Sequence, residues 1–524
     1  MSEGFSRRRL IETLAACGLA AGMLPTGAAA SFGDDDELAF STPRPFSFDQ
    51  LIGRASRLAQ QPYAPVPKPA PEITPKLSYE HHGNIRYPAE KAMFAEGPGQ
   101  FPATFFHLGM FFERPVRIFA VTGGEASELQ YKKRYFDMPD DSPAQEMPEG
   151  SGFAGFRLHE NRQRDDWKTQ DWIAFLGASY FRAIGELGQY GLSARGIAVD
   201  TAVDGPEEFP AFTEFYLEPD EDGTVTIYAL LDGPSLAGAY RFHLTRNDEV
   251  IVDVDQRLFF RKTVRRLGIA PLTSMFWYSE YGDGVLDDWR PEVHDSDGLA
   301  IHTGSGERIW RPLNNPPHTI VSSFVDEDIK GFGLLQRDRN FEHYLDGVHY
   351  ERRPSLWIEP HSDWGKGSVQ LVEIPTNDEI HDNIVAFWVP QERVGQGSAL
   401  RFGYRMSWAA DQPGWPDALA RCVATRMGRG GEPGTDRPEG VKKFVVEFAD
   451  GPLDDLKTDD PVEVAVSASR GTLSYIFTEQ IPGTPRWRAQ FDLDPDGQEP
   501  VELRAYLHVG DQPVSETWMY QFNG

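Results

Sequence analysis

The stretch EVIVDVDQRLFF, residues 249–260, alternates apolar with polar side chains and is rich in β-branched residues. TVTIYALLD, at 224–232, has the same character, and Asp and Gly residues bound both runs. This alternation is typical of strands with one buried face. Similar short runs recur between Gly and Pro residues, namely GFGLLQRD, SVQLVEIP, NIVAFWVP and ALRFGYRMSW. Because helices do not alternate with these strands, the sequence predicts a mainly β protein, a large sandwich of antiparallel sheets rather than a Rossmann fold or an α/β barrel.

The C-terminal part is predicted to form a second, smaller domain. Residues 428–440, GRGGEPGTDRPEG, contain no apolar side chain, which is typical of a linker. Six short β runs follow in residues 441–524, with turn residues between them, and this pattern favours an immunoglobulin-like β-sandwich. We therefore expect a large domain over residues 42–427, the linker, and the immunoglobulin-like domain. Within the large domain, Ser47 is predicted to cap a helix.

The N-terminus predicts export. In residues 1–30, Ser6-Arg7-Arg8 precedes a short apolar stretch, and Ala28-Ala29-Ala30 supplies a small-residue cleavage site. This order is typical of a twin-arginine signal peptide, so we expect the protein in the periplasm. Beyond the signal Cys422 is the only cysteine, which excludes an internal disulfide in the mature protein.

The net charge and the absence of several common motifs argue against some classes of partner and enzyme. The formal net charge of −29 argues against nucleic acid and anionic lipid as partners, but a neutral sugar remains compatible. The sequence has no GxSxG elbow, HExxH helix or Walker loop. Asp295-Ser296-Asp297-Gly298 begins like a calcium loop but lacks the later acidic ligands, and Glu80-His81-His82 has no further ligand nearby. The sequence therefore predicts neither a metal site nor a cofactor.

Carboxylates surrounded by aromatic and arginine residues are the remaining signal. They occur around residues 294–297, in HYLDGVHYERRPSLWIEPHSDWGKG at 343–367, and in PTNDEIHDNIVAFW at 375–388. Aromatic rings stack on the apolar faces of sugar rings, and paired acids are the usual groups that cleave glycosidic bonds. The composition indicates a carbohydrate site only weakly, since most aromatic side chains in a β-sandwich belong to its core.

Long runs in these segments and elsewhere make the chain similar to a known family. It closely resembles the osmoregulated periplasmic glucan biosynthesis proteins, OpgG and OpgD (also MdoG and MdoD), and its twin-arginine signal resembles the OpgD branch. The matching runs include FLGASYFRA at 175–183, QYGLSARG at 189–196, APLTSMF at 270–276, HDSDGL at 294–299, RPLNNP at 311–316, GFGLLQRDRNFEHY at 331–344, RRPSLWIEP at 352–360, DNIVAFW at 382–388 and SETWMYQF at 515–522.

The resemblance implies a galactose-mutarotase-like N-terminal sandwich joined to an immunoglobulin-like domain. It also implies a periplasmic enzyme that processes the β-1,2-linked glucan backbone, as an inverting endo-β-1,2-glucanase. Two alternatives stay open: a transglycosylase or cyclase that uses the same acids, and a non-catalytic glucan-binding assembly factor. The partners it suggests are β-1,2-glucan, a second copy of the chain, and the inner-membrane glucan synthase.

The resemblance also assigns roles to residues. Asp382 aligns with the family's catalytic acid and Asp295 with its base, while Glu379 and Tyr350 support the acid or the path of the water. A capping role in a turn or at a strand entry is the alternative for both aspartates. The predicted substrate-binding residues are Tyr180, Arg195, Trp310, Arg353, Trp357 and Trp364.

For some of these residues, a position in the hydrophobic core is the alternative to a role in substrate binding. Trp357 and Trp388 lie in alternating strand context, which favours a core position over a sugar platform. The segments SEYGDGVLDDW, at 279–289, and HYLDGVHY, at 343–350, vary among family members. If they line the cleft, they set the chain-length preference and the balance of hydrolysis against transfer.

Overall fold

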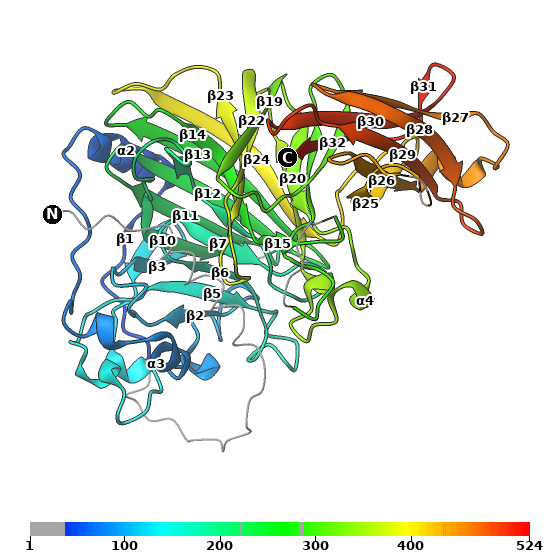
Figure 1. Ribbon diagram of the computed structural model, residues 1–524. Helices are drawn as coiled ribbons and strands as arrows, with labels where there is room; N and C mark the ends of the chain where they lie inside the picture. The colour runs from blue at the N-terminus through cyan, green and yellow to red at the C-terminus, as the bar shows by residue number, and fades with distance from the viewer. Residues whose placement is uncertain (1–36, 221, 282–287, 433, 435, 524) are drawn as a thin grey trace.

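The computed structural model describes residues 37–220, 222–281, 288–432, 434 and 436–523 (Figure 1). The predicted signal peptide, residues 1–30, lies outside the described residues. In the described part of the chain, no helix has both the length and the apolar character needed to cross a membrane. The structure is mainly β, as predicted, with two sheets stacked in a large N-terminal sandwich and a smaller sandwich at the C-terminus.

One long sheet runs through both parts of the molecule. Its order within the described residues is β1 (Arg44–Pro45), β4 (Glu125–Glu128), β3 (Arg117–Thr122), β10 (Ala211–Pro219), β11 (Val225–Asp232), β12 (Leu236–Arg246), β13 (Val250–Phe260), β24 (Ala399–Ala409), β21 (Ser355–Pro360), β20 (Gly331–Leu335), β17 (Gly298–His302), β18 (Arg308–Pro312), β32 (Thr517–Phe522), β30 (Val501–Val509) and β27 (Val462–Ala468), with β31 (Gln512–Pro513) beside β30.

The other strands form three further sheets. The facing sheet has the order β19 (Ile320–Glu327), β22 (Lys366–Glu373), β23 (Ile384–Pro390), β14 (Leu267–Ser274), β8 (Ser193–Arg195), β7 (Tyr180–Ala183), β6 (Asp171–Leu176), β5 (Gly155–His159) and β2 (Ala103–Phe106), with β9 (Ala198–Val199) beside β14. β15 (Phe276–Tyr278) pairs with β16 (Val293–His294), and the C-terminal sheet is β25 (Arg421–Arg429), β26 (Lys442–Ala449), β29 (Trp487–Asp494) and β28 (Thr472–Gln480).

Helices are short in the described part of the chain. They are α2 (Phe48–Ala59), α3 (Tyr79–Gly83) and α4 (Phe341–Tyr344), with 3₁₀ turns η1 (Thr74–Lys76), η2 (Ala89–Lys91), η3 (Lys133–Tyr135), η4 (Pro143–Glu146), η5 (Tyr350–Arg352) and η6 (Gly451–Asp455). The predicted cap is confirmed, because the Ser47 side chain accepts a hydrogen bond from the backbone N–H of Gln50. Leu51 and Ala55 are buried, so α2 covers the outer face of the long sheet.

The alternation in residues 249–260 gives β13 one face that is buried in the core. In β13 every second side chain is buried, and the strand pairs along its length with β12 and β24. Rings from the two sheets meet between them: Phe156 contacts Phe215 at 5.0 Å between ring centroids, and Phe175 contacts Phe242 at 5.5 Å. Since fully burying a Phe side chain contributes about 1.5–3 kcal/mol, these inner faces stabilise the sandwich.

The predicted linker begins at the end of a strand of the C-terminal sheet. β25 begins at Arg421 and pairs antiparallel with β26, so residues 428–440 lie at the end of one strand and in the connection to the next. Residues 428 and 429 are therefore the last two residues of β25, and the chain enters the C-terminal sheet before residue 428. β32 also pairs with β18 of the large domain, through Ile309 with Thr517 and Trp310 with Trp518, so one sheet is continuous across both parts.

A buried ion pair joins the two parts. The Arg337 guanidinium donates to Glu516 at 2.5 Å and to the carbonyl oxygen of Cys422 at 3.0 Å, and it lies 3.7 Å from the centroid of the Trp310 ring. Glu516 also accepts the backbone N–H of Cys422 at 2.7 Å, and its side chain is fully buried. The pair thus fixes the start of β25 against the large domain.

Removing the carboxylate of this pair is expected to destabilise the protein. Glu516→Gln leaves the buried Arg337 charge uncompensated, so the free energy of unfolding should fall by about 3–5 kcal/mol. Urea denaturation measures this change. The matched control is Glu447→Gln, because Glu447 pairs with the half-exposed Arg426, and an exposed pair contributes about 0–1 kcal/mol. Equal losses in the two variants would contradict the prediction.

Candidate active site

One pocket brings together the four predicted catalytic residues. Asp295, Tyr350, Glu379 and Asp382 line a cavity of about 140 Å³, together with the predicted substrate-binding residue Arg353. The other lining residues are Arg182, Gln189, Tyr190, Gly191, Met275, Asp346, Val348 and Ile380. The pocket therefore combines the end of β7, the segment after β16, η5 and the turn before β23.

The turn that carries Asp382 is held by its neighbour. The side chain of Asn383 accepts the backbone N–H of Phe276 at 2.8 Å and donates to the carbonyl oxygens of Phe276 and Ile374, each at 2.9 Å. Asn383 is buried, so these hydrogen bonds are shielded from water. Asn383 thus fixes the backbone beside Asp382 against β15. β15 pairs with β16, the strand directly before Asp295.

Asp382 has the electrostatics of a general acid. Burial raises its pKa to about 6, with the nearby charge of Asp295 acting in the same direction, while the positive charge of Arg182 lowers it. The side chain is only 8% exposed, and Oδ2 has no hydrogen-bond partner in the part of the chain that the structure describes. A carboxyl group of this kind holds a proton at mildly acidic pH and has an oxygen available to deliver it.

Asp295 lies opposite a guanidinium group. Arg353 forms an ion pair with Oδ1 of Asp295, and its guanidinium lies 4.1 Å from the centroid of the Tyr350 ring. The backbone N–H of Asp295 donates to the carbonyl oxygen of Met275 at 2.8 Å. A negative charge on this buried carboxylate is therefore compensated, as an ionised base requires.

Tyr350 and Glu379 continue the wall of the pocket. The Tyr350 hydroxyl donates to Oε2 of Glu379, and burial raises the pKa of this tyrosine, so the hydroxyl keeps its proton. Glu379 also accepts from Arg290 at 2.7 Å, and Arg290 donates in turn to Asp346 at 2.7 Å. These contacts fix the orientation of a hydroxyl that lines the same pocket as the two aspartates.

The comparisons with known proteins identify the family. The family model described as "Periplasmic glucan biosynthesis protein, MdoG" matches residues 46–522. The chain belongs to this family. It is similar to "Glucans biosynthesis protein D 2" of Ralstonia nicotianae, with 56% identity over 99% of this chain and 98% of that protein. It is also similar to "Glucans biosynthesis protein D" of Xanthomonas oryzae pv. oryzae, with 49% identity over 92% and 90% of the two chains, and of Stenotrophomonas maltophilia, with 47% identity over 97% and 95%.

Solved structures are more distant. The Slr1438 protein from Synechocystis sp. PCC 6803 is 9% identical, with a TM-score of 0.24 over 46% of this chain and 93% of that chain. A galactose mutarotase related enzyme from Lactobacillus acidophilus is also 9% identical, with a TM-score of 0.21 over 44% and 95% of the two chains.

Three predicted substrate-binding tryptophans lie in the core. Trp357 is 2% exposed and packs against glycines of β20, while Trp310 lies beneath Arg337. Trp364 contacts Trp388 at 6.1 Å between centroids, in the main core cluster. A sugar platform needs one open ring face, and none of the three rings lines the pocket. These three predicted substrate-binding residues therefore lie outside the pocket and pack in the core.

Tyr180 and Arg195 lie behind the pocket rather than in its lining. The Arg195 guanidinium is buried, lies 4.8 Å from the centroid of the Tyr180 ring, and donates to Glu207 at 2.9 Å and to Thr273 at 2.8 Å. Its positive charge still acts on the site, because it lowers the pKa of Asp382. Arg195 thus influences the acid without touching a ligand in the pocket.

The sequence interpretation missed several lining residues of this family member. Arg182 and Tyr190 lie in two of the runs that carried the resemblance, so a signal for them was present, although no charge pattern singled them out. Asp346 lies in the variable segment at 343–350. Arg290 does not line the pocket but donates to its lining residues Glu379 and Asp346, and it directly follows the variable segment at 279–289. Part of the latter segment, residues 282–287, lies outside the described residues.

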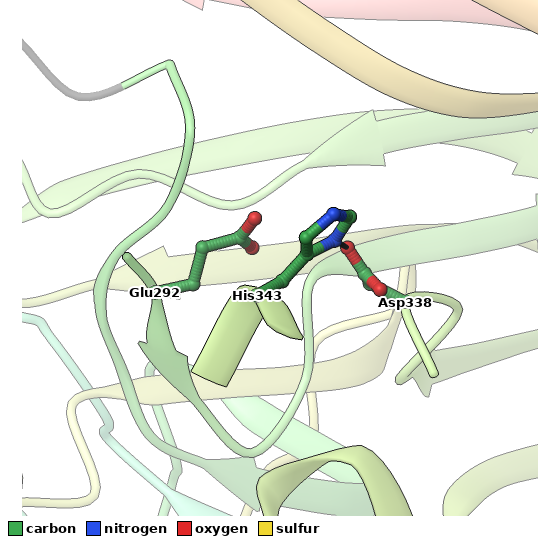
Figure 2. Close-up of side chains that lie close together, drawn as sticks. All are labelled: Glu292, Asp338 and His343. Atoms are coloured by element: carbon green, nitrogen blue, oxygen red, sulfur yellow. Dashed lines mark hydrogen bonds and ion pairs between the residues drawn. The ribbon is translucent and has the colours of Figure 1, made fainter. Parts of the chain in front are cut away.

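One group near the pocket, among the residues that the structure describes, could hold a metal ion. Ligand atoms of Glu292, Asp338 and His343 lie within 4.8 Å of one another, and Figure 2 shows the His343 ring between the two carboxylates. Mixed carboxylate and imidazole ligands suit Zn²⁺ or Mn²⁺. In this structure Asp338 is hydrogen-bonded to Nδ1 of His343 at 2.5 Å, and Glu292 is hydrogen-bonded at 2.9 Å to Nε2 of His294, which lies outside the group.

Proposed function

We propose that this protein is an inverting endo-β-1,2-glucanase that acts in the periplasm during osmoregulated periplasmic glucan biosynthesis. The observation that carries the proposal is that Asp382 and Asp295 line one pocket, the first with a raised pKa and the second paired with Arg353. Environments that separate two carboxyl groups in this way divide the acid and base roles between them. Membership of a periplasmic glucan biosynthesis family supports the choice of substrate.

In the proposed reaction, Asp382 donates its proton to the glycosidic oxygen as the bond to the anomeric carbon breaks. Asp295 takes a proton from the water that attacks the opposite face of that carbon. In the direct form the water gives its proton to Asp295. In the relayed form the Tyr350 hydroxyl turns its own proton from Glu379 to Asp295 as it accepts the proton of the water. The water oxygen forms the new bond, and the two carboxyl groups end with their protonation states exchanged. Inverting pairs are typically about 6.5–9.5 Å apart, which leaves room for this water.

The size of the pocket bears on how a glucan binds. Its volume of about 140 Å³ is small beside the ~300–1,000 Å³ of typical ligand pockets. The pocket therefore encloses the reacting sugar at most, and the rest of a polymer lies outside it.

Product analysis on linear β-1,2-glucan tests the proposal. Short linear oligomers, whose new reducing ends appear first as the α-anomer in NMR spectra, are expected from an inverting hydrolase. Rings that lack the mass of an added water would indicate cyclisation, and longer linear chains would indicate transfer to a sugar hydroxyl. An unchanged polymer would contradict catalysis and favour a glucan-binding role.

The pH dependence follows from Asp382. Because burial raises the pKa of this group to about 6, the protonated acid is present below that pH and is lost above it. We expect kcat to fall about tenfold per pH unit on the alkaline side of pH 6. Arg182 lowers the pKa of Asp382, so Arg182→Gln should move the alkaline limb of the kcat profile to higher pH. A limb that stays in place would show that Asp382 does not control it.

A further inference from the structure

A buried glutamine connects the two sides of the pocket. Gln336 directly follows β20, is fully buried, and does not line the cavity. Its Nε2 lies 3.2 Å from the carbonyl oxygen of His294, 3.1 Å from that of Tyr350, and 2.9 Å from the Tyr344 hydroxyl. Its Oε1 lies 2.9 Å from Nδ1 of His294. One side chain therefore contacts three segments that are separate in the sequence.

The orientation of this amide is determined by its neighbours. Backbone carbonyl oxygens only accept hydrogen bonds, so the –NH₂ group of Gln336 must face those of His294 and Tyr350. The Tyr344 hydroxyl donates to the carbonyl oxygen of Asp338 at 3.1 Å, so toward Gln336 it can only accept, and the two hydrogens of the –NH₂ group are shared among three acceptors. A flipped amide would bring its oxygen against two carbonyl oxygens in a buried site, at the cost of unmade hydrogen bonds.

These hydrogen bonds act on the peptide groups beside the proposed base and the relay hydroxyl. The carbonyl of His294 belongs to the same peptide plane as the N–H of Asp295, which donates to Met275, so that plane is held on both sides. The carbonyl of Tyr350 accepts from Gln336 and from the backbone N–H of Arg353 at 3.1 Å. Gln336 thus contacts the backbone carbonyls of His294 and Tyr350, whose peptide groups determine where the side chains of Asp295, Tyr350 and Arg353 lie.

We propose that Gln336 is a positioning residue that holds the base Asp295 and the Tyr350 hydroxyl in register across the pocket. The inference rests on the proposed glucanase function, because the geometry it maintains is that of the base and its relay. Gln336 itself touches neither substrate nor water in the cavity. Its effect is expected in the chemical step rather than in substrate binding, since a side chain displaced by about 1 Å can cost about 10²-fold in rate.

Two substitutions test this role. Gln336→Met keeps the length of the side chain without donors, and Gln336→Glu keeps an oxygen toward His294 but replaces the –NH₂ group. For both we expect kcat on β-1,2-glucan to fall by about 10²-fold while KM changes less than about threefold. The matched control is Gln256→Met in β13, because Gln256 is equally buried but its amide makes no hydrogen bond within the described residues. It should keep wild-type kcat.

Two further measurements distinguish a failure of this inference from a failure of the glucanase proposal. Thermal melting shows whether the Gln336 variants are folded, and their crystal structures show where Asp295 and Tyr350 lie. A wild type that does not cleave the glucan refutes the proposed function, whereas the structure of Gln336→Met still tests the positioning. The inference requires that the Tyr350 hydroxyl leave Glu379, or that Asp295 shift, in a folded variant. It is overturned if both side chains stay in place, if kcat is unchanged, or if Gln256→Met loses as much kcat as Gln336→Met.

Discussion

Asp382→Asn is expected to lower kcat for β-1,2-glucan by about 10²–10⁴-fold, because the amide has no proton to give to the leaving oxygen. The substitution preserves shape, and the Asn383 hydrogen bonds that hold the turn are unaffected, so the fold should remain. Initial rates of reducing-end formation measure the loss. A β-linked substrate with a nitrophenol leaving group should recover most of the rate, since such a group departs without protonation.

The control for this variant lies in the same turn. Asp378→Asn makes the same chemical change at a residue that does not line the pocket, and it is expected to retain wild-type kcat. Near-normal activity of Asp382→Asn would remove Asp382 from the acid role. A similar loss in both variants would show that the charge of the turn, rather than one carboxyl group, is what matters.

Asp295→Asn is expected to lower kcat by a similar factor, about 10²–10⁴-fold, for a different reason. Here the attacking water loses the group that accepts its proton, so a better leaving group should not restore the rate. The Asp295 charge also raises the pKa of Asp382, so the alkaline limb of any residual kcat profile should move to lower pH. Rescue by the nitrophenyl substrate would contradict the base role.

This variant also changes stability, which has to be measured separately. Asp295 carries the counter-charge of Arg353, and its loss leaves a buried guanidinium without its carboxylate. Thermal melting of Asp295→Asn is therefore expected to show a lower Tm than that of Asp382→Asn, which loses no ion pair. Rates compared below both melting temperatures then report on the chemical step.

The strands and the capped helix could be predicted because their signals are local. Alternation in residues 249–260 produces β13, and Ser47 caps α2, as expected. The composition of residues 428–440 does not by itself separate two structures, because a connection between two strands of one sheet and a linker between domains are both polar and rich in Gly and Pro. Only the pairing of β25 with β26 distinguishes them.

For the tryptophans, too, local composition does not separate two possible positions of the side chain. Trp310 and Trp364 lie in aromatic segments beside acids, a composition shared by sugar sites and by the cores of β-sandwiches. Their burial depends on glycines, cations and rings contributed by other strands, and no local pattern encodes those neighbours. The sequence interpretation missed Arg182 because no local pattern connects it with Asp382. Its effect on the pKa of Asp382 arises only when the fold brings β7 and the turn before β23 to one pocket.

The sequence by itself determined that this is a mainly β protein of the periplasmic glucan biosynthesis family, because alternation and long matching runs are read along the chain. Only the tertiary structure decided which carboxyl group is buried enough to hold a proton, which arginine faces Asp295, and that Gln336 connects their backbones. Burial, hydrogen bonds and charge act through space over a few ångströms, and the residues they join here are far apart in the chain.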